Sequence, residues 1–210
     1  MRSAAIGVSV HSGWGAVVAL TVDQGVEEVL DRRRLIIIDP KAKGAAQPYH
    51  HVEELEIRAA ERHLTRCAAD STRLAVEELT RVSTELRDRG FVLVASVILL
   101  SSATPLPDLE EVLGSHALIH TAEGEFFRQA FRRALERLEI RVTGIRAHDL
   151  DDCAVKAFGN AAPDVHKRID AMGQSLGAPW TKDEKTAALA AAIVLAGTHP
   201  KDHPALPPST

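Results

Sequence analysis

Residues 91–100 read FVLVASVILL, an apolar run with Ser96 as its one polar residue. A strand that is apolar along its whole length is typical of the centre of a sheet covered on both faces. Before it, apolar residues recur every three or four positions from about His51 to Arg89, which predicts one long helix or two helices with a break near Asp70-Ser71. Because a parallel strand needs a crossover, we expect residues 91–100 to join an existing sheet after this helical segment.

That existing sheet is predicted from the first 39 residues, where Ala4–Val10, Trp14–Val22 and Val26–Asp39 are rich in strand-forming side chains. The small-residue turns His11-Ser12-Gly13 and Asp23-Gln24-Gly25 join them, and two successive hairpins predict an antiparallel meander. Asp39-Pro40 should end the third strand, because proline has no N–H to donate to a ladder.

The rest of the chain predicts alternating helices and one more strand. After a turn at Ser101–Pro107 we expect a helix from Asp108 to about Leu138, a strand at Ile140–Ile145, and helices at Asp151–Phe158, Asp164–Leu176 and Lys182–Ala196. The predicted fold is α/β: a mixed five-stranded sheet, with a three-strand antiparallel meander plus two parallel strands, flanked by helices. We expect one domain over residues 1–198 and a frayed tail over residues 199–210, which contain four prolines.

The charge, the cysteine content and the hydropathy of the chain indicate which partners and which cellular compartment to expect. The formal net charge of −4 and the pI near 6.2 disfavour a broad nucleic-acid-binding surface, although they leave nucleic acid open as a partner. Cys67 and Cys153 are far apart and match no zinc-ligand spacing, which suits a reducing compartment. No apolar stretch approaches the roughly 20 residues that span a bilayer. We expect a cytoplasmic protein without a membrane partner, with homodimer formation left open.

The order of these elements resembles the ribonuclease-H-like superfamily and, within it, the RuvC-type Holliday junction resolvases. Ala5–Ser9 looks like the family's first strand, Thr121–Gly124 like the start of its middle helix, and Lys185–Ala192 like its last helix. The resemblance covers most of the chain and implies the same fold. The segments His11–Trp14 and Gln47–His50 also resemble a bacterial family that brings no activity with it.

The acidic residues that this resemblance would require are mostly missing. The family's first-strand aspartate falls on Ser9, and Ser96–Ser102, at the end of the fourth strand, contains no acid. Of the acids that open the last helix, Asp183 or Glu184 is the match. Two-metal cleavage of phosphodiesters needs several carboxylates around cations about 4 Å apart. We therefore do not expect the family's nuclease chemistry.

A stripe of candidate functional residues lies in the predicted middle helix. His116, His120 and Glu123 are spaced i, i+4 and i+7, so a helix aligns them on one face. Two histidines and a carboxylate can bind a ligand, transfer protons or hold a metal; an ordinary polar helix face is the alternative. Gly124 costs helix stability, and we expect close packing on the sheet as its reason.

Further candidates lie at turns and helix starts. Ser9, His11, Ser12 and Trp14 lie where the first strand leaves the sheet, and open α/β sheets bind ligands at strand ends. Tyr49 and His50 open the long helix, where backbone N–H groups favour anions. Thr181 and Glu184 match a capping box, which leaves Asp183 and Lys185 as residues at the rim of a site.

We combine these residues into one predicted polar pocket for a small anionic or phosphorylated ligand. The candidates for catalysis are His11, His116, His120 and Glu123, and those for ligand binding are Ser9, Ser12, Trp14, Tyr49, His50, Asp183 and Lys185. Hydrolysis with a histidine as general base is the expected chemistry; no cofactor is predicted, with a divalent metal left open. Two alternatives stand: a non-catalytic dimeric binding or scaffold module with incidental histidines, and a nuclease whose metal site is rebuilt from histidines and Glu123. The single pocket requires His11 to lie near His116 or His120.

Overall fold

The first three strands form the predicted meander in a computed structural model that describes residues 1–101 and 105–198. Strands β1 (Arg2–His11) and β2 (Trp14–Asp23) pair antiparallel from His11 opposite Trp14 to Ala5 opposite Leu20, and β3 (Val26–Ile36) pairs antiparallel with β2. Gly13 has a φ of 78°, which glycine adopts readily, at the first turn. Strand β3 ends at Ile36, three residues before the predicted Asp39.

Two parallel strands complete the sheet in the order β3-β2-β1-β4-β5. Strand β4 (Phe91–Leu100) lies parallel to β1, and β5 (Arg141–Arg146) lies parallel to β4. The predicted mixed five-stranded sheet is therefore confirmed, with the apolar β4 near its centre.

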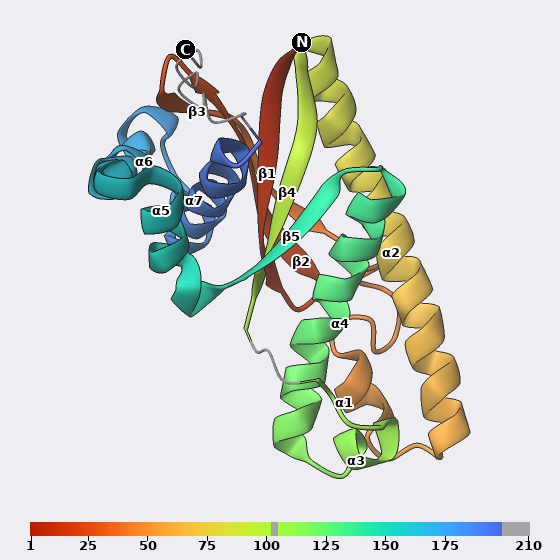
Figure 1. The fold of residues 1–210 in the computed structure, drawn as a ribbon. Coiled ribbons are helices and arrows are strands. Elements are labelled where there is room, and N and C mark those ends of the chain that lie inside the picture. The colour runs from red at the N-terminus through yellow and green to blue at the C-terminus, as the bar shows by residue number, and fades with distance from the viewer. Residues whose placement is uncertain (102–104, 199–210) are drawn as a thin grey trace, which may run out of the picture.

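The helices cover both faces of the sheet (Figure 1). On one face lie α2 (Ile57–Asp88) and α4 (His116–Arg137), and on the other α5 (Leu150–Phe158), α6 (Ala162–Leu176) and α7 (Lys182–Ala196). The short helices α1 (Pro48–Val52) and α3 (Leu109–Leu113) lie with the first turns of α4 beyond the carboxyl ends of β1 and β4. Single 3₁₀ turns, η1 (Ala147–Asp149) and η2 (Gly159–Ala161), flank α5. None of the described helices is both long and apolar enough to cross a membrane.

Two helix predictions need correction. Of the two alternatives for the long helical segment, the unbroken helix is confirmed, since α2 runs through Asp70-Ser71 for 32 residues, but its predicted start near His51 is wrong because residues 53–56 separate α1 from α2. The predicted helix from Asp108 to Leu138 is interrupted at Gly114-Ser115, which separates α3 from α4. Both breaks give the chain short helices that turn back onto α2 and α4. Part of the predicted Ser101–Pro107 turn and the whole predicted tail lie outside the described residues.

Each face of the sheet has its own apolar core. Phe127 and Phe131 of α4 pack with Leu79 of α2 and Ile6 of β1 on one face, all fully buried. The other core combines the alanine-rich α7 with residues of the strands and of α5 and α6. Small side chains let a helix approach a sheet closely, so α7 can lie directly against β1 and β2.

Gly7 is where β1 and α7 come closest. A Cβ added at Gly7 would lie 1.9 Å from the backbone oxygen of Ala187, so no side chain fits between the two elements. Gly124 has a different role from the predicted one: a Cβ there would meet Arg128 Nη1 at 2.9 Å, and Arg128 Nε donates a hydrogen bond to the Leu99 carbonyl. The close approach of helix and sheet thus depends on Gly7 rather than Gly124, and it brings the start of α7 to the carboxyl end of β1.

Candidate functional site

The first group of polar residues lies where β1 ends and α7 begins. We call Ser9, His11, Trp14, Arg34 and Asp183 the β1-end group. Ser9 Oγ donates to Asp183 Oδ1 at 3.0 Å, and His11 Nε2 donates to Asp183 Oδ2 at 3.0 Å. The His11 ring stacks on Trp14, with ring centroids 4.2 Å apart and planes 9° apart. The Arg34 guanidinium lies 3.7 Å from the centroid of the Trp14 ring.

The start of α7 positions Asp183 for these contacts. Thr181 and Glu184 form the predicted capping box, in which Glu184 Oε2 accepts from the Thr181 backbone N–H at 2.7 Å and from its hydroxyl at 2.6 Å. The cap fixes the first turn of α7 and satisfies backbone N–H groups that have no partner within the helix. Asp183, in that turn, is therefore held toward β1.

The hydrogen bonds of the β1-end group are not those of a nucleophile relay. In a Ser–His–Asp triad the histidine bonds both the serine and the carboxylate. Here Asp183 accepts from both Ser9 and His11, so the serine hydroxyl points at the carboxylate and not at the imidazole. The arrangement links α7 to β1 and leaves the serine without a base that would activate it.

The β1-end group also does not fit the pair of metal ions that ribonuclease-H-like nucleases use. Asp183 is its single carboxylate, and both of its oxygens already accept hydrogen bonds. The neighbouring Glu184 is occupied with Thr181. Two divalent cations need several oxygen ligands each, which these residues do not supply.

The second group, which we call the histidine group, consists of His50, His116, His120 and Glu123. Helix α4 carries His116, His120 and Glu123, and His50 comes from α1. One nitrogen from each histidine lies within 4.8 Å of the others, and His116 Nε2 lies 3.1 Å from His120 Nε2. His116 and His120 are exposed, whereas His50 is largely buried.

Glu123 holds α1 against α4. Its Oε1 accepts three hydrogen bonds, from the backbone N–H groups of Tyr49 and His50 at 2.8 and 3.1 Å and from His50 Nδ1 at 3.1 Å. These backbone groups belong to the first turn of α1, so a side chain distant in the sequence acts as the cap that the helix start lacks. Oε2 is buried and has no hydrogen-bond partner among the described residues.

Burial shifts the pKa values of Glu123 and of Tyr49 beside it. Burial raises the pKa of the Glu123 carboxyl, and the hydrogen bonds from His50 and Tyr49 oppose this shift without cancelling it. Burial, followed by the charge of Glu123, raises the pKa of the Tyr49 phenol. When His50 Nδ1 donates to Glu123 Oε1, a neutral imidazole has its lone pair on Nε2.

The histidine group has three nitrogens near enough to one another to hold a metal ion, and one pair has the spacing of two zinc ligands. Two nitrogens bound to a tetrahedral zinc ion, each about 2.0–2.1 Å from it, lie about 3.3 Å apart. The observed His116–His120 separation of 3.1 Å is close to this value. A histidine ligand generally donates its second ring N–H to a carboxylate or carbonyl, as His50 does to Glu123.

The structure divides the predicted site residues between these two groups. His11, Ser9, Trp14 and Asp183 belong to the β1-end group, and His50, His116, His120 and Glu123 to the histidine group, with Tyr49 beside it. No hydrogen bond, ion pair or ring contact joins His11 to His116 or His120 among residues 1–101 and 105–198. Ser12 is exposed in the turn, and Lys185 turns away to Asp170 of α6, with 3.0 Å between Nζ and Oδ1.

Sequence reasoning missed Arg34, which lies over Trp14. The pairing register of β2 and β3 would have predicted this contact. Trp14 pairs with Ile36, so Arg34 lies two residues along the neighbouring strand and on the same face of the sheet.

Comparisons with known proteins identify the fold. The chain matches no protein-family model and no curated protein. Among solved structures, RuvC of Thermus thermophilus in complex with a Holliday junction substrate superimposes with a TM-score of 0.51 and 11% identity, over 90% of this chain and 91% of that chain. The structure described as Thermus thermophilus RuvC gives 0.48 and 11% over 90% and 92%, and an Aquifex aeolicus member of the Ppx/GppA family gives 0.37 and 12% over 76% and 40%. At such identity the first likeness shows the fold alone: the chain has a ribonuclease-H-like fold and resembles RuvC distantly.

Proposed function

We propose that this protein holds a divalent transition metal ion, preferably zinc, through His50, His116 and His120, and that with this ion bound it would bind a small anionic or phosphorylated ligand and hydrolyse it with water. The observation that carries the proposal is the convergence of three imidazole nitrogens within 4.8 Å. Three histidines are a common ligand set for catalytic zinc, which keeps its fourth position open.

Glu123 supports this proposal through His50. Its hydrogen bond fixes the tautomer of His50 so that the Nε2 lone pair is free to bind a cation. Its carboxylate also supplies negative charge beside a site whose ligands are neutral. Glu123 would therefore act as a positioning residue and not as a ligand.

The exposure of His116 and His120 supports a role beyond structural metal binding. A structural zinc site is closed by four protein ligands, whereas here the described residues supply three, two of them exposed. When bound, a zinc ion lowers the pKa of a coordinated water and polarises a carbonyl or phosphoryl oxygen. A small anionic ligand could reach such a position from solvent.

Metal binding is testable by isothermal titration of the metal-free protein with zinc chloride. We expect one zinc ion per chain, with loss of binding in the double variant His116→Ala/His120→Ala. His148→Ala/His166→Ala is the matched control, since both histidines lie outside the group and should leave zinc binding unchanged. Glu123→Gln should weaken binding about 10- to 100-fold. Equal binding by the wild type and His116→Ala/His120→Ala would refute the site.

Hydrolysis is tested separately with p-nitrophenyl phosphate. Activity should require added zinc, should disappear in His116→Ala/His120→Ala and should persist in the control variant. Zinc binding without turnover of this or related phosphate and carboxylate esters would contradict the catalytic part of the proposal and leave a metal-dependent binding protein.

A further inference from the structure

A cavity between α2 and α4 is lined by no member of the β1-end group or the histidine group, although Tyr49, which lies beside the histidine group, lines one end of it. Its volume is about 570 Å³, within the range of sites for small organic ligands. Figure 1 shows α2 and α4 side by side along their length, with α1 against their lower ends. We call this cavity the α2–α4 trough.

Apolar side chains form part of the walls of the trough, and Thr65, Glu125 and Gln129 are polar residues in the same lining. Leu64, Ala68 and Thr72 line it from α2, and Ala122, Phe126 and Ala130 from α4. Tyr49 and Leu106 line the same end as Ala122, whereas Arg133 and Arg137 lie toward the other end of α4. At 1.5 Å per residue, the part of α4 from Ala122 to Arg137 is about 22 Å long. The lining residues on α4 therefore extend over a distance comparable to that of an extended hydrocarbon chain.

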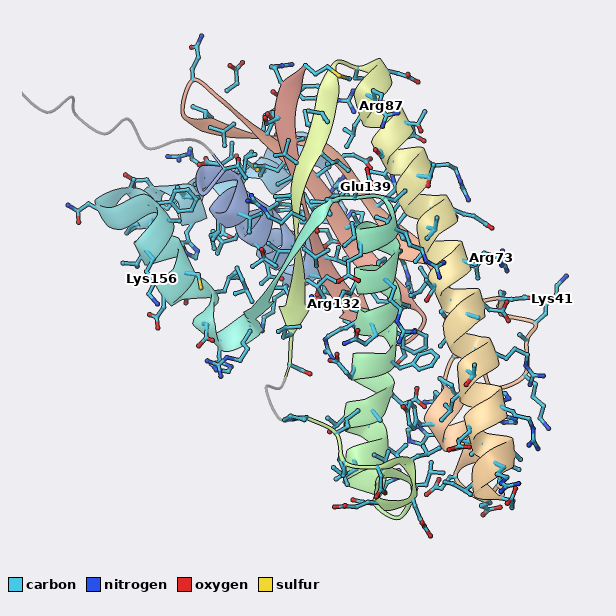
Figure 2. All side chains as sticks on the ribbon, turned by 45° about the vertical axis from the view of Figure 1, so that its right-hand side comes forward. Lys41, Arg73, Arg87, Arg132, Glu139 and Lys156 are labelled. Atoms are coloured by element: carbon cyan, nitrogen blue, oxygen red, sulfur yellow. The ribbon has the colours of Figure 1, made fainter. Side chains whose placement is uncertain are left out.

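The positive charges of the trough lie toward the C-terminal end of α4. Arg133 and Arg137 are one helical turn apart and exposed, and no described acidic group lies within 4 Å of either guanidinium. Their neighbour Arg132 is different: Figure 2 shows it on α4, and a Cβ added at Gly144 of β5 would lie 3.5 Å from its Nη2. Two guanidinium groups without an acidic partner, in a protein of net charge −4, therefore face the same elongated cavity.

Glu125 is the acidic residue in the trough lining, and its carboxylate is already engaged. Oε1 accepts from Gln129 Nε2 at 2.6 Å, and Oε2 lies 4.0 Å from Arg128 Nη1. Glu125 makes no ion pair with Arg133 or Arg137 among the described residues. The trough thus has apolar side chains along part of its wall, an aromatic end, and two arginines toward the C-terminal end of α4.

We propose that the α2–α4 trough binds a single-chain fatty acid, with the hydrocarbon chain along the apolar wall and the carboxylate at Arg133 and Arg137. Guanidinium groups match the planar geometry of a carboxylate. Each additional CH2 group that the trough buries should tighten binding by up to about fourfold.

The test is isothermal titration with sodium dodecanoate below its micelle concentration, alongside octanoate and dodecyltrimethylammonium. Dodecanoate should bind at one molecule per chain and at least about tenfold more tightly than octanoate. Dodecyltrimethylammonium has the same chain and the opposite charge, and should bind at least about tenfold more weakly. Equal binding of the cationic amphiphile, or no saturable binding of dodecanoate, would overturn the proposal.

Variants separate the trough from other surfaces. Ala69→Trp places a bulky side chain in the trough lining at an exposed position, so the fold should tolerate it and dodecanoate binding should be lost. Arg133→Glu/Arg137→Glu should weaken binding at least about tenfold. Arg58→Glu/Arg62→Glu, an equally exposed pair on α2 outside the trough, is the matched control and should have no effect. If Ala69→Trp instead abolishes a dimer on size-exclusion chromatography and dodecanoate does not bind, the trough is an interface between two copies and the proposal fails.

Discussion

Gly7→Ala tests the contact that brings α7 to the end of β1. The added Cβ would lie 1.9 Å from the Ala187 backbone oxygen and 2.6 Å from its carbonyl carbon, whereas real Cβ contacts are essentially never shorter than 3.0 Å. The obstacle is the backbone of a buried helix, so no side-chain rotation can relieve it. Helix α7 must therefore move by more than an ångström.

The sign of the effect makes this substitution informative. Replacing glycine by alanine at an unstrained position stabilises a protein by about 0.4–1 kcal/mol, because the unfolded chain loses freedom. Overpacking a close-packed core costs about 1–3 kcal/mol and occasionally more. With a backbone clash, we expect a net loss of about 2–3 kcal/mol in the free energy of unfolding, a large share of the typical 5–15 kcal/mol.

The assay is urea denaturation followed by circular dichroism. Two control variants separate packing from backbone strain. Gly114→Ala, at a φ of −76° with its nearest neighbour atom 3.5 Å away, should change stability by less than about 0.5 kcal/mol. Gly90→Ala, at a φ of +85° with open space around it, should cost about 1 kcal/mol from backbone strain alone. A Gly7→Ala protein as stable as the wild type would refute the close contact of β1 and α7.

Three further predictions concern buried polar groups. Burial raises the pKa of the Cys67 thiol, which makes this cysteine unreactive in the native protein. Iodoacetamide should therefore label Cys153 in the native protein and Cys67 only after urea unfolding. Equal labelling rates of the two cysteines in the native protein would contradict this. Arg168→Ala leaves the buried carboxylate of Glu27 without its two hydrogen bonds of 2.7 and 3.0 Å, and should lower the free energy of unfolding by about 1.5–3 kcal/mol in the same urea assay. Lys167→Ala is the control: Lys167 belongs to an exposed ion pair, and its loss should change stability by less than about 0.5 kcal/mol. Because burial raises the pKa of Glu123, the native state binds its proton more tightly than the unfolded state, and stability should fall as the pH rises from about 4.3 through the raised native pKa. In metal-free buffer, Glu123→Gln should remove that part of the pH dependence, and an unchanged slope in the variant would show that another group is responsible.

Local patterns in the sequence were sufficient for most elements of the fold. The apolar run at residues 91–100 is β4, and the alanine-rich segment with its capping box is α7, both with the predicted bounds. These predictions succeeded because a strand buried on both faces and a capped helix are specified by residues close together in the chain. The crossover rules for parallel strands predicted that residues 91–100 join the sheet of the first hairpin, and the structure gives the full strand order.

The helix breaks and the grouping of the polar residues required the tertiary structure. Asp70-Ser71 has polar residues typical of a break, yet α2 continues there because its apolar face packs on the core. The chain turns instead at residues 53–56, where α1 is held by Glu123, 73 residues away from His50 in the sequence. Periodicity contains no information about such a distant partner.

The sequence by itself thus determined the elements, their order and the stripe of His116, His120 and Glu123 on one helix face. The sequence placed His11, His50 and Asp183 in one pocket with that stripe, and only the tertiary structure grouped His50 with the stripe and His11 with Asp183. Only there does Gly7 appear as the point where helix and sheet meet. The physical reason is that side-chain period and caps act over a few residues, whereas sites are formed by close packing between elements that the chain brings together from far apart.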